Sequence, residues 1–203
     1  GSELAELAKD GGMDRFRAKT GLPLAAYFSG LKLRWLLNNI EGLRADAENG
    51  DAIFGNMDTF IAWHLTGGLH ITDVTNASRT QLMNLHTLEW DSELCELFEV
   101  PVSALPRIQA NIGEFGQSAP EGFLGIAAPV TGMAGDQQAA LFGQLAFEVG
   151  EAKCTYGTGA FLLQNTGADI ELGDTRLIAT VAWVDATGAA TYALEGSVFV
   201  AGA

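Results

Sequence analysis

The chain has 203 residues, of which 48% are hydrophobic and 18% are charged. Its 11 basic and 25 acidic residues give a formal net charge of −14, which argues against nucleic acid or an anionic membrane as partner, because both are bound by clustered lysine and arginine. No apolar run reaches the roughly twenty residues needed to span a bilayer, and no signal peptide is apparent. We therefore expect a cytoplasmic protein without a membrane span.

The first part of the chain is predicted to be mainly helical. Composition and apolar spacing indicate helices over residues 13–20 and 29–40, with Gly42 ending the second. One face of that second helix carries Leu33, Leu36, Leu37 and Ile40. Residues 52–65 suit either a helix or a strand.

A short amphipathic helix is predicted over residues 91–98, with its acidic residues on a solvated face. Residues 101–120 are predicted to be rich in loops. The three histidines are His64, His70 and His86. None has a second histidine at helical metal-ligand spacing, so we expect no metal site built on histidine.

After residue 150 the pattern changes to strands. The predicted strands are residues 152–159, 160–165, 177–184 and 190–194, and a helix is predicted to start at residue 195 and run to 203. We place a domain boundary at this change, with residues 1–146 in a first domain and 147–203 in a second. Cys95 and Cys154 lack metal-ligand spacing and are expected to be ordinary buried or half-buried thiols of a reducing compartment.

The most informative stretch is Gly-Asp-Gln-Gln-Ala-Ala-Leu-Phe-Gly-Gln at residues 135–144. A run of β-branched and small residues precedes it, and helical composition follows, so Asp136 is predicted at a helix N-cap. Read alone, the segment is more typical of a plain capping aspartate. The adjacent amides of Gln137 and Gln138 also suit the binding of hydroxyl groups, beside a carboxylate that can deprotonate an alcohol.

A second motif, Thr-Tyr-Gly-Thr-Gly-Ala-Phe-Leu-Leu at residues 155–163, indicates a tight hairpin. Its glycines let backbone N–H groups approach a phosphate, and the hydroxyl of Thr158 adds a donor. A Gly-Thr-Gly turn is, by itself, more often only a turn.

Together these motifs resemble the glycerol kinases of the FGGY carbohydrate kinase family. The resemblance extends to Tyr-Phe-Ser-Gly-Leu-Lys-Leu-Arg-Trp at 27–35, Met-Asp-Thr-Phe at 57–60, Thr-Asn-Ala-Ser-Arg-Thr at 75–80 and Tyr-Ala-Leu-Glu-Gly at 192–196. These segments follow the family's order along the chain and cover it from about Met13 to Ala203.

The resemblance implies an α/β architecture, the ribonuclease H-like fold of actin and hexokinase, in which two domains close on a cleft. It also implies that this chain is an internal piece of a longer enzyme. Residues 1–146 would then be the later part of the polyol-binding domain, and residues 147–203 the first strands of the nucleotide-binding domain. We expect such a piece to be inactive alone, and the parent enzyme to be a homo-oligomer.

The family's functional residues carry over position by position. Asp136 matches the catalytic base that accepts the proton of a terminal glycerol hydroxyl, close to the Mg²⁺ of MgATP. Gln137 and Tyr27 match polar contacts to glycerol, and Phe161 matches an apolar wall against its carbon atoms. Without the resemblance, Tyr27 would be read as a boundary aromatic and Phe161 as a core strand residue.

The phosphate contacts of the nucleotide carry over to Thr158 and Gly159. Gly202 matches the start of a glycine segment that also faces the nucleotide. ATP and Mg²⁺ are thus the implied cofactors, and glycerol the implied acceptor.

Regulation is expected to differ from that of relatives inhibited by fructose 1,6-bisphosphate. Those relatives carry Gly-Thr-Arg where this chain has Gly-Ile-Ala at residues 125–127, so Ala127 replaces the arginine. Without that guanidinium the bidentate phosphate clamp is lost, and we expect the inhibition to be weak or absent. The same loop lacks the histidine that some relatives phosphorylate.

Two other functions stay open. An FGGY kinase for xylulose, ribulose or gluconate is the nearer alternative, although those families usually replace the double glutamine. A non-catalytic interaction module is the more distant one, and the intact residues at the motif positions argue against it.

Overall fold

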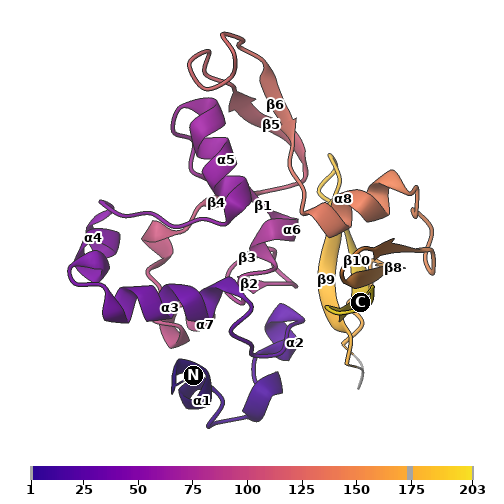
Figure 1. The fold of residues 1–203 in the computed structure, drawn as a ribbon, viewed down its shortest axis with the longest axis horizontal. Coiled ribbons are helices and arrows are strands. Elements are labelled where there is room, and N and C mark those ends of the chain that lie inside the picture. The colour runs from indigo at the N-terminus through magenta and orange to yellow at the C-terminus, as the bar shows by residue number, and fades with distance from the viewer. Residues whose placement is uncertain (1, 173–175, 203) are drawn as a thin grey trace.

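A computed structural model describes residues 2–172 and 176–202 (Figure 1). The helices of the N-terminal part are α1 (Ser2–Leu7), η1 (Gly12–Asp14), α2 (Arg17–Thr20), α3 (Ser29–Asn39), α4 (Leu43–Asn49), α5 (Met57–Thr66), α6 (Val74–Ala77), α7 (Ser92–Leu97) and η2 (Val102–Ala104). Its strands are β1 (Ile71–Asp73), β2 (Met83–Asn84), β3 (Glu89–Trp90), β4 (Arg107–Gln109), β5 (Ile112–Gln117) and β6 (Pro129–Gly132). The C-terminal part follows with α8 (Asp136–Gly143), β7 (Ala152–Tyr156), β8 (Ala160–Gly167), β9 (Ile178–Val184) and β10 (Ala190–Val198).

The strands of the two parts are joined differently. β1 and β4 pair in parallel, with Ile71 opposite Arg107, and β5 pairs with β6 in antiparallel fashion. In the C-terminal part, β7, β8, β10 and β9 form an antiparallel sheet in that order. Figure 1 shows α8 beside this sheet, and the two pack through a cluster that includes Leu141 and Leu163.

Helix α3 forms where predicted, but its buried face matches the predicted one only in part. Leu37 is buried and Leu33 packs against the core as predicted. Ile40 is extended and 46% exposed, whereas Arg34 is only 5% exposed and lies on the buried face with Leu31 and Leu37. Gly42, with φ of 80°, is the N-cap of α4 rather than the end of α3. The apolar pattern left Arg34 out of this face because its side chain is charged.

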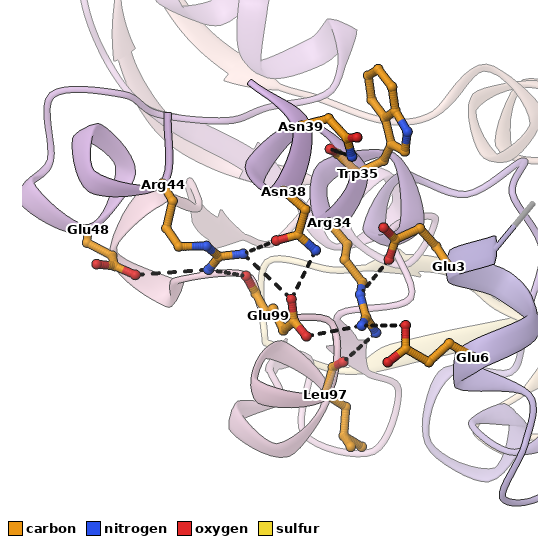
Figure 2. A network of polar contacts seen from close by, with 10 residues as sticks. All are labelled: Glu3, Glu6, Arg34, Trp35, Asn38, Asn39, Arg44, Glu48, Leu97 and Glu99. Carbon is orange, nitrogen blue, oxygen red and sulfur yellow. Dashed lines mark hydrogen bonds and ion pairs between the residues drawn. The ribbon is translucent and has the colours of Figure 1, made fainter. Parts of the chain in front are cut away.

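The burial of Arg34 is explained by a network of carboxylates (Figure 2). Its guanidinium forms ion pairs with Glu3 at 2.7 Å, Glu6 at 3.2 Å and Glu99 at 3.0 Å, and donates to the carbonyl oxygen of Leu97 at 3.3 Å. A buried charge is tolerated only when it is paired in this way. The network ties α1 and the end of α7 to α3.

Three further predictions were wrong. Residues 13–20 are split between η1 and α2, because Phe16 turns inward between them, is 4% exposed and packs on Phe98 at 5.3 Å. The predicted loop 101–120 contains β4 and β5, whose partners β1 and β6 lie elsewhere in the chain. Local sequence cannot reveal such non-local pairing.

The chain from Glu195 to Val198 continues β10 instead of starting a helix, because Glu195 to Val198 pair with Leu163 to Ala160 of β8. The remaining part of that predicted helix shows no helical turn up to Gly202, and Ala203 lies outside the described residues. The predicted helix over residues 91–98 is confirmed as α7, with Asp91 as its N-cap. The mixed segment 52–65 is irregular at first and then forms α5.

The N-terminal and C-terminal parts share a core. Val74 and Ala77 of α6 pack with Ala179 and Val181 of β9, and the phenol of Tyr192 donates to the carbonyl of Leu85 at 2.8 Å. The boundary predicted between residues 146 and 147 falls between α8 and β7 and stays a prediction. Within the described residues, no helix is both long and apolar enough to cross a membrane.

The cysteines differ from each other. Cys95 is 2% exposed, and burial, with a smaller effect of the Asp91 charge, raises its pKa to about 12. Cys154 is exposed on β7, so its expected burial was wrong. Both thiols are free.

Candidate active site

A cavity of about 730 Å³ lies where α3, α5, α6 and α8 face the strands β8 and β10. Its lining includes Tyr27, Asp136, Gln137 and Phe161, the residues selected from the sequence as contacts to a polyol. The tertiary structure therefore brings together side chains that are up to 134 positions apart in sequence, counted from Tyr27 to Phe161. Their individual roles stay predictions.

Asp136 is the first residue of α8 and not its N-cap, which corrects the sequence-based placement. Gly135 is the N-cap, in extended conformation, and its N–H donates to the hydroxyl of Thr75 at 2.8 Å. The carboxylate of Asp136 accepts from the N–H of Gln137 at 2.8 Å and is exposed to the cavity. A carboxylate has about four lone-pair sites, so Asp136 keeps capacity to accept from a hydroxyl group.

Gln137 and Gln138 face different surroundings. Gln138 is 4% exposed, and its amide nitrogen donates to the hydroxyl of Thr180 on β9 at 3.3 Å. Gln137 is half-buried at the cavity wall, and its amide nitrogen lies 3.4 Å from Asp136 Oδ2. Of the two glutamines, Gln137 has the side-chain contacts next to Asp136, and Gln138 ties α8 to the sheet.

Lys153 lies behind Gln137 and was missed by the sequence reasoning. It is 5% exposed, and its ammonium donates to Gln137 Oε1, to Thr155 Oγ1 at 3.0 Å and to the carbonyl oxygen of Phe161 at 3.1 Å. Burial lowers the pKa of Lys153, and the negative charges of Glu195 and Asp136 oppose that effect. One signal was available, because Lys153 is the charged residue within the apolar run of residues 152–163.

A second missed pair lies on the cavity wall. Arg79 donates from both terminal nitrogens to Glu195, at 2.7 and 3.0 Å, and Glu195 is 2% exposed. The guanidinium of Arg79 also lies 5.7 Å from the ring centroid of Phe28. This bidentate pair joins the segment after α6 to β10, and so links the N-terminal and C-terminal parts.

Aromatic rings also link the N-terminal and C-terminal parts at the cavity. The ring of Phe199 lies 5.7 Å from that of Tyr27 and 6.1 Å from that of Phe161. Tyr27 also packs edge-on against Phe28 at 5.3 Å. Phe199 was not selected from the sequence, because it lies in the segment that was wrongly predicted as a helix.

Thr158, Gly159 and Gly202 meet at a separate corner, the turn between β7 and β8. The N–H groups of Ala201 and Gly202 donate to the carbonyl of Thr158, at 2.9 and 3.2 Å. A Cβ on Gly202 would lie 2.5 Å from the carbonyl oxygen of Gly157, and a Cβ on Gly159 would lie 2.9 Å from that of Val198. Side chains are excluded by this close backbone approach. The assignment of this corner to the nucleotide phosphates stays a prediction.

The described part of the chain offers no cluster of ligands to a resident metal ion. Among the described residues, no group of three or more His, Cys, Asp and Glu side chains could hold one. His70 and His86 instead contact the backbone carbonyl oxygens of Phe54 and Ala18, at 2.7 and 3.0 Å. The carboxylate of Asp136 is the oxygen ligand that would suit Mg²⁺ brought in with a nucleotide.

Comparison with known proteins shows which family the chain belongs to. Residues 2–143 match the model of the N-terminal domain of the FGGY family of carbohydrate kinases. Curated relatives include glycerol kinases of Methylobacterium radiotolerans, at 55% identity over 205 residues, and Chloroflexus aggregans, at 54% over 202 residues. Both alignments cover 98% of this chain and 40% of the relative. The chain thus spans about two fifths of the length of the relatives it matches.

Solved structures of carbohydrate kinases are also similar to this chain. Plasmodium falciparum glycerol kinase with ADP matches 97% of this chain and 39% of its own, with a TM-score of 0.91 and 40% identity. A ligand-bound xylulose kinase of Lactobacillus acidophilus, at 24% identity and a TM-score of 0.83, covers 98% of this chain and 39% of its own and shares the fold. The α/β fold predicted from the sequence, the actin- and hexokinase-like fold of the sugar kinases, is thereby confirmed for the part that this chain covers. The chain belongs to the FGGY family of carbohydrate kinases.

Proposed function

We propose that the full-length protein containing this chain transfers the γ-phosphate of MgATP to glycerol, forming sn-glycerol 3-phosphate and ADP. The observation that carries this proposal is the pairing of the Asp136 carboxylate and the Gln137 amide on the wall of one cavity, which Tyr27 and Phe161 also line. The identity of 51–55% to curated glycerol kinases supports the same acceptor.

Asp136 is the residue that takes the proton. A terminal hydroxyl of glycerol donates its hydrogen bond to the carboxylate, and the hydroxyl oxygen then forms a bond to the γ-phosphorus. The bond between that phosphorus and the bridging oxygen of ADP breaks, and the proton passes to Asp136. Because phosphoryl transfer passes through a loose transition state, orientation of the hydroxyl contributes as much as the basicity of Asp136.

The remaining residues bind and orient. Gln137 and Tyr27 contact hydroxyl groups, and Phe161 packs against the carbon atoms of the acceptor. Thr158, Gly159 and Gly202 present the backbone corner to the phosphates of the nucleotide. Asp136 would help to hold Mg²⁺ brought in with the nucleotide, and that ion would supply neutralisation of charge on the transferred phosphate.

The proposal extends to the regulation, oligomeric state and compartment of the full-length protein. Ala127 offers no guanidinium to a bisphosphate, so inhibition by fructose 1,6-bisphosphate is weak or absent. The parent is a homo-oligomer of the cytoplasm, where MgATP and reduced thiols occur together. The chain of 203 residues, without the rest of the parent, does not turn over glycerol.

The test uses a parent-length protein in which this chain replaces the matching segment of the Methylobacterium radiotolerans relative. ADP release is measured with MgATP and each of glycerol, xylulose, ribulose and gluconate. Selective turnover of glycerol supports the proposal. Preference for xylulose, ribulose or gluconate overturns glycerol as the acceptor but keeps the kinase mechanism. No ADP release with any of the four, while the unaltered relative is active, favours a non-catalytic role.

A further inference from the structure

Lys153 is a buried lysine on β7 whose contacts converge on the back of the candidate site. Its ammonium donates to Gln137 on α8 and, 3.1 Å away, to the backbone carbonyl of Phe161 on β8. A third bond goes to the hydroxyl of Thr155 at 3.0 Å, two residues along the same face of β7. All three donors of the ammonium are therefore used, and two of them reach residues that line the cavity.

The contact with Gln137 fixes which end of the amide faces the cavity. An ammonium group only donates hydrogen bonds, so the atom of Gln137 that faces it must be the carbonyl oxygen. The amide nitrogen then points the other way, and it lies 3.4 Å from Asp136 Oδ2. Gln137 therefore presents a donor beside the carboxylate.

This polarity matters for an alcohol bound between the two side chains. A hydroxyl group has one donor and two acceptor lone pairs. If its oxygen accepts from Gln137, its hydrogen is left to donate to Asp136, which is the direction that deprotonation needs. A flipped amide would present its carbonyl oxygen to the hydroxyl and compete with Asp136 for the same hydrogen.

We propose that Lys153 is a positioning residue that holds the Gln137 amide as a donor toward the acceptor hydroxyl and, through the Phe161 carbonyl, fixes the apolar wall. The inference rests on the proposed function, because it assigns a polarity to the contact with the polyol. Lys153 itself touches no substrate, and acts through Gln137 and Phe161.

A buried ammonium is costly unless charges nearby compensate for it. The carboxylates of Glu195 and Asp136 supply that compensation, and Glu195 is itself held by Arg79. A neutral side chain at position 153 would avoid the cost of burial, but it would leave the amide of Gln137 free to rotate. Packing in the strand would therefore be met by a neutral side chain, and it is the contact with Gln137 that requires the ammonium.

The experiment is a double-mutant cycle in the parent-length protein, with Lys153→Met, Gln137→Ala and the double variant. Lys153→Met is expected to lower kcat/KM for glycerol by about 10- to 100-fold, through KM for glycerol and not KM for MgATP. In the Gln137→Ala background the same change should have a smaller effect than in the unaltered protein, because, of the two contacts with residues that line the cavity, only that with the Phe161 carbonyl is then left to lose. Lys19→Met is the control, since Lys19 is another lysine with its ammonium contacts, to Asp91 and Glu93, away from the cavity.

A general loss of stability would give a different pattern. It would lower the folded fraction for Lys153→Met and Lys19→Met alike and would leave both KM values unchanged. Equal, multiplicative losses from Lys153→Met in the presence and absence of Gln137 would overturn the inference. So would full activity of Gln137→Glu, because a carboxylate there offers no donor to the hydroxyl.

A second readout separates this inference from the proposed function. The unaltered protein, Lys153→Met, Gln137→Ala and the double variant are unfolded in denaturant, and their unfolding free energies are compared. Non-additive values support the Lys153–Gln137 contact even if another polyol proves to be the acceptor, in which case the kinetic cycle is run on that polyol. If no acceptor is turned over, the proposed function fails, and additive unfolding free energies would also rule out the contact.

Discussion

Arg79 and Glu195 form a bidentate ion pair that joins the two parts of the chain at the wall of the cavity, with N–O distances of 2.7 and 3.0 Å. Glu195 is 2% exposed and also accepts from the hydroxyl of Ser197 at 3.0 Å. The pair holds β10 against the segment that follows α6. Both residues of the pair line the cavity.

Breaking this pair is expected to destabilise the protein. Arg79→Met leaves the buried carboxylate of Glu195 without its partner, which costs about 3–5 kcal/mol of unfolding free energy. Denaturant unfolding of the parent-length protein measures the loss. The double variant Arg79→Met with Glu195→Met should recover much of the loss, because it removes both charges. A double variant no more stable than Arg79→Met would show that the pair matters through packing and not through charge.

Asp136→Asn is expected to remove activity and keep the fold. Loss of the proton acceptor lowers kcat by about 100- to 10,000-fold, whereas the exposed side chain contributes little to packing. Steady-state ADP release and thermal unfolding measure the two effects. Asp185→Asn, at a partly buried aspartate in the turn between β9 and β10, is the control and should keep full activity. Near-normal kcat in Asp136→Asn would refute its assignment as the base.

Gly202→Ala is expected to weaken nucleotide binding. The added Cβ would lie 2.5 Å from the carbonyl oxygen of Gly157, so the backbone corner must open. KM for MgATP should rise by about 10-fold or more, with KM for glycerol unchanged. Gly143→Ala, in α8, is the control, because its Cβ would meet no atom within 4 Å. Equal nucleotide KM values for the two variants would place the phosphates elsewhere.

Asp58 gives a pH-dependent prediction. Burial raises its pKa, and the nearby charge of Asp73 raises it further, while hydrogen bonds such as that from Thr72 at 2.5 Å oppose the shift. A carboxyl group with a raised pKa in the folded state contributes stability below its unfolded pKa of about 4, and that contribution is lost as pH rises through the folded pKa. The protein should therefore gain from a neutral side chain at higher pH.

Asp58→Asn keeps an oxygen for the Thr72 hydroxyl and removes the titration. The unfolding free energy of the variant minus that of the unmodified protein is expected to increase as the pH rises from about 4 to about 8, so that the variant becomes relatively more stable. Denaturant unfolding at several pH values measures it. A difference that is flat with pH, or that falls, would contradict the raised pKa.

The sequence by itself determined the elements whose signals are local. Asp91 and the amphipathic run after it predicted α7, and the glycine corner at Gly157–Gly159 predicted the hairpin of β7 and β8. The order of the motifs also indicated the family and the candidate residues Asp136, Gln137, Tyr27 and Phe161. Residue types and their spacing can be read from the sequence without knowing which residues are in contact.

Only the tertiary structure decided the features that depend on distant partners. β4 and the end of β10 form because of strands elsewhere in the chain, and Arg34 is buried because three glutamates surround it. Lys153 behind Gln137 and Arg79 against Glu195 are long-range pairs of charged or polar groups, and single-sequence patterns treat such residues as solvent-exposed. The physical reason is the same in each case, since the burial of a polar group is favourable only when the fold supplies its hydrogen-bond partners.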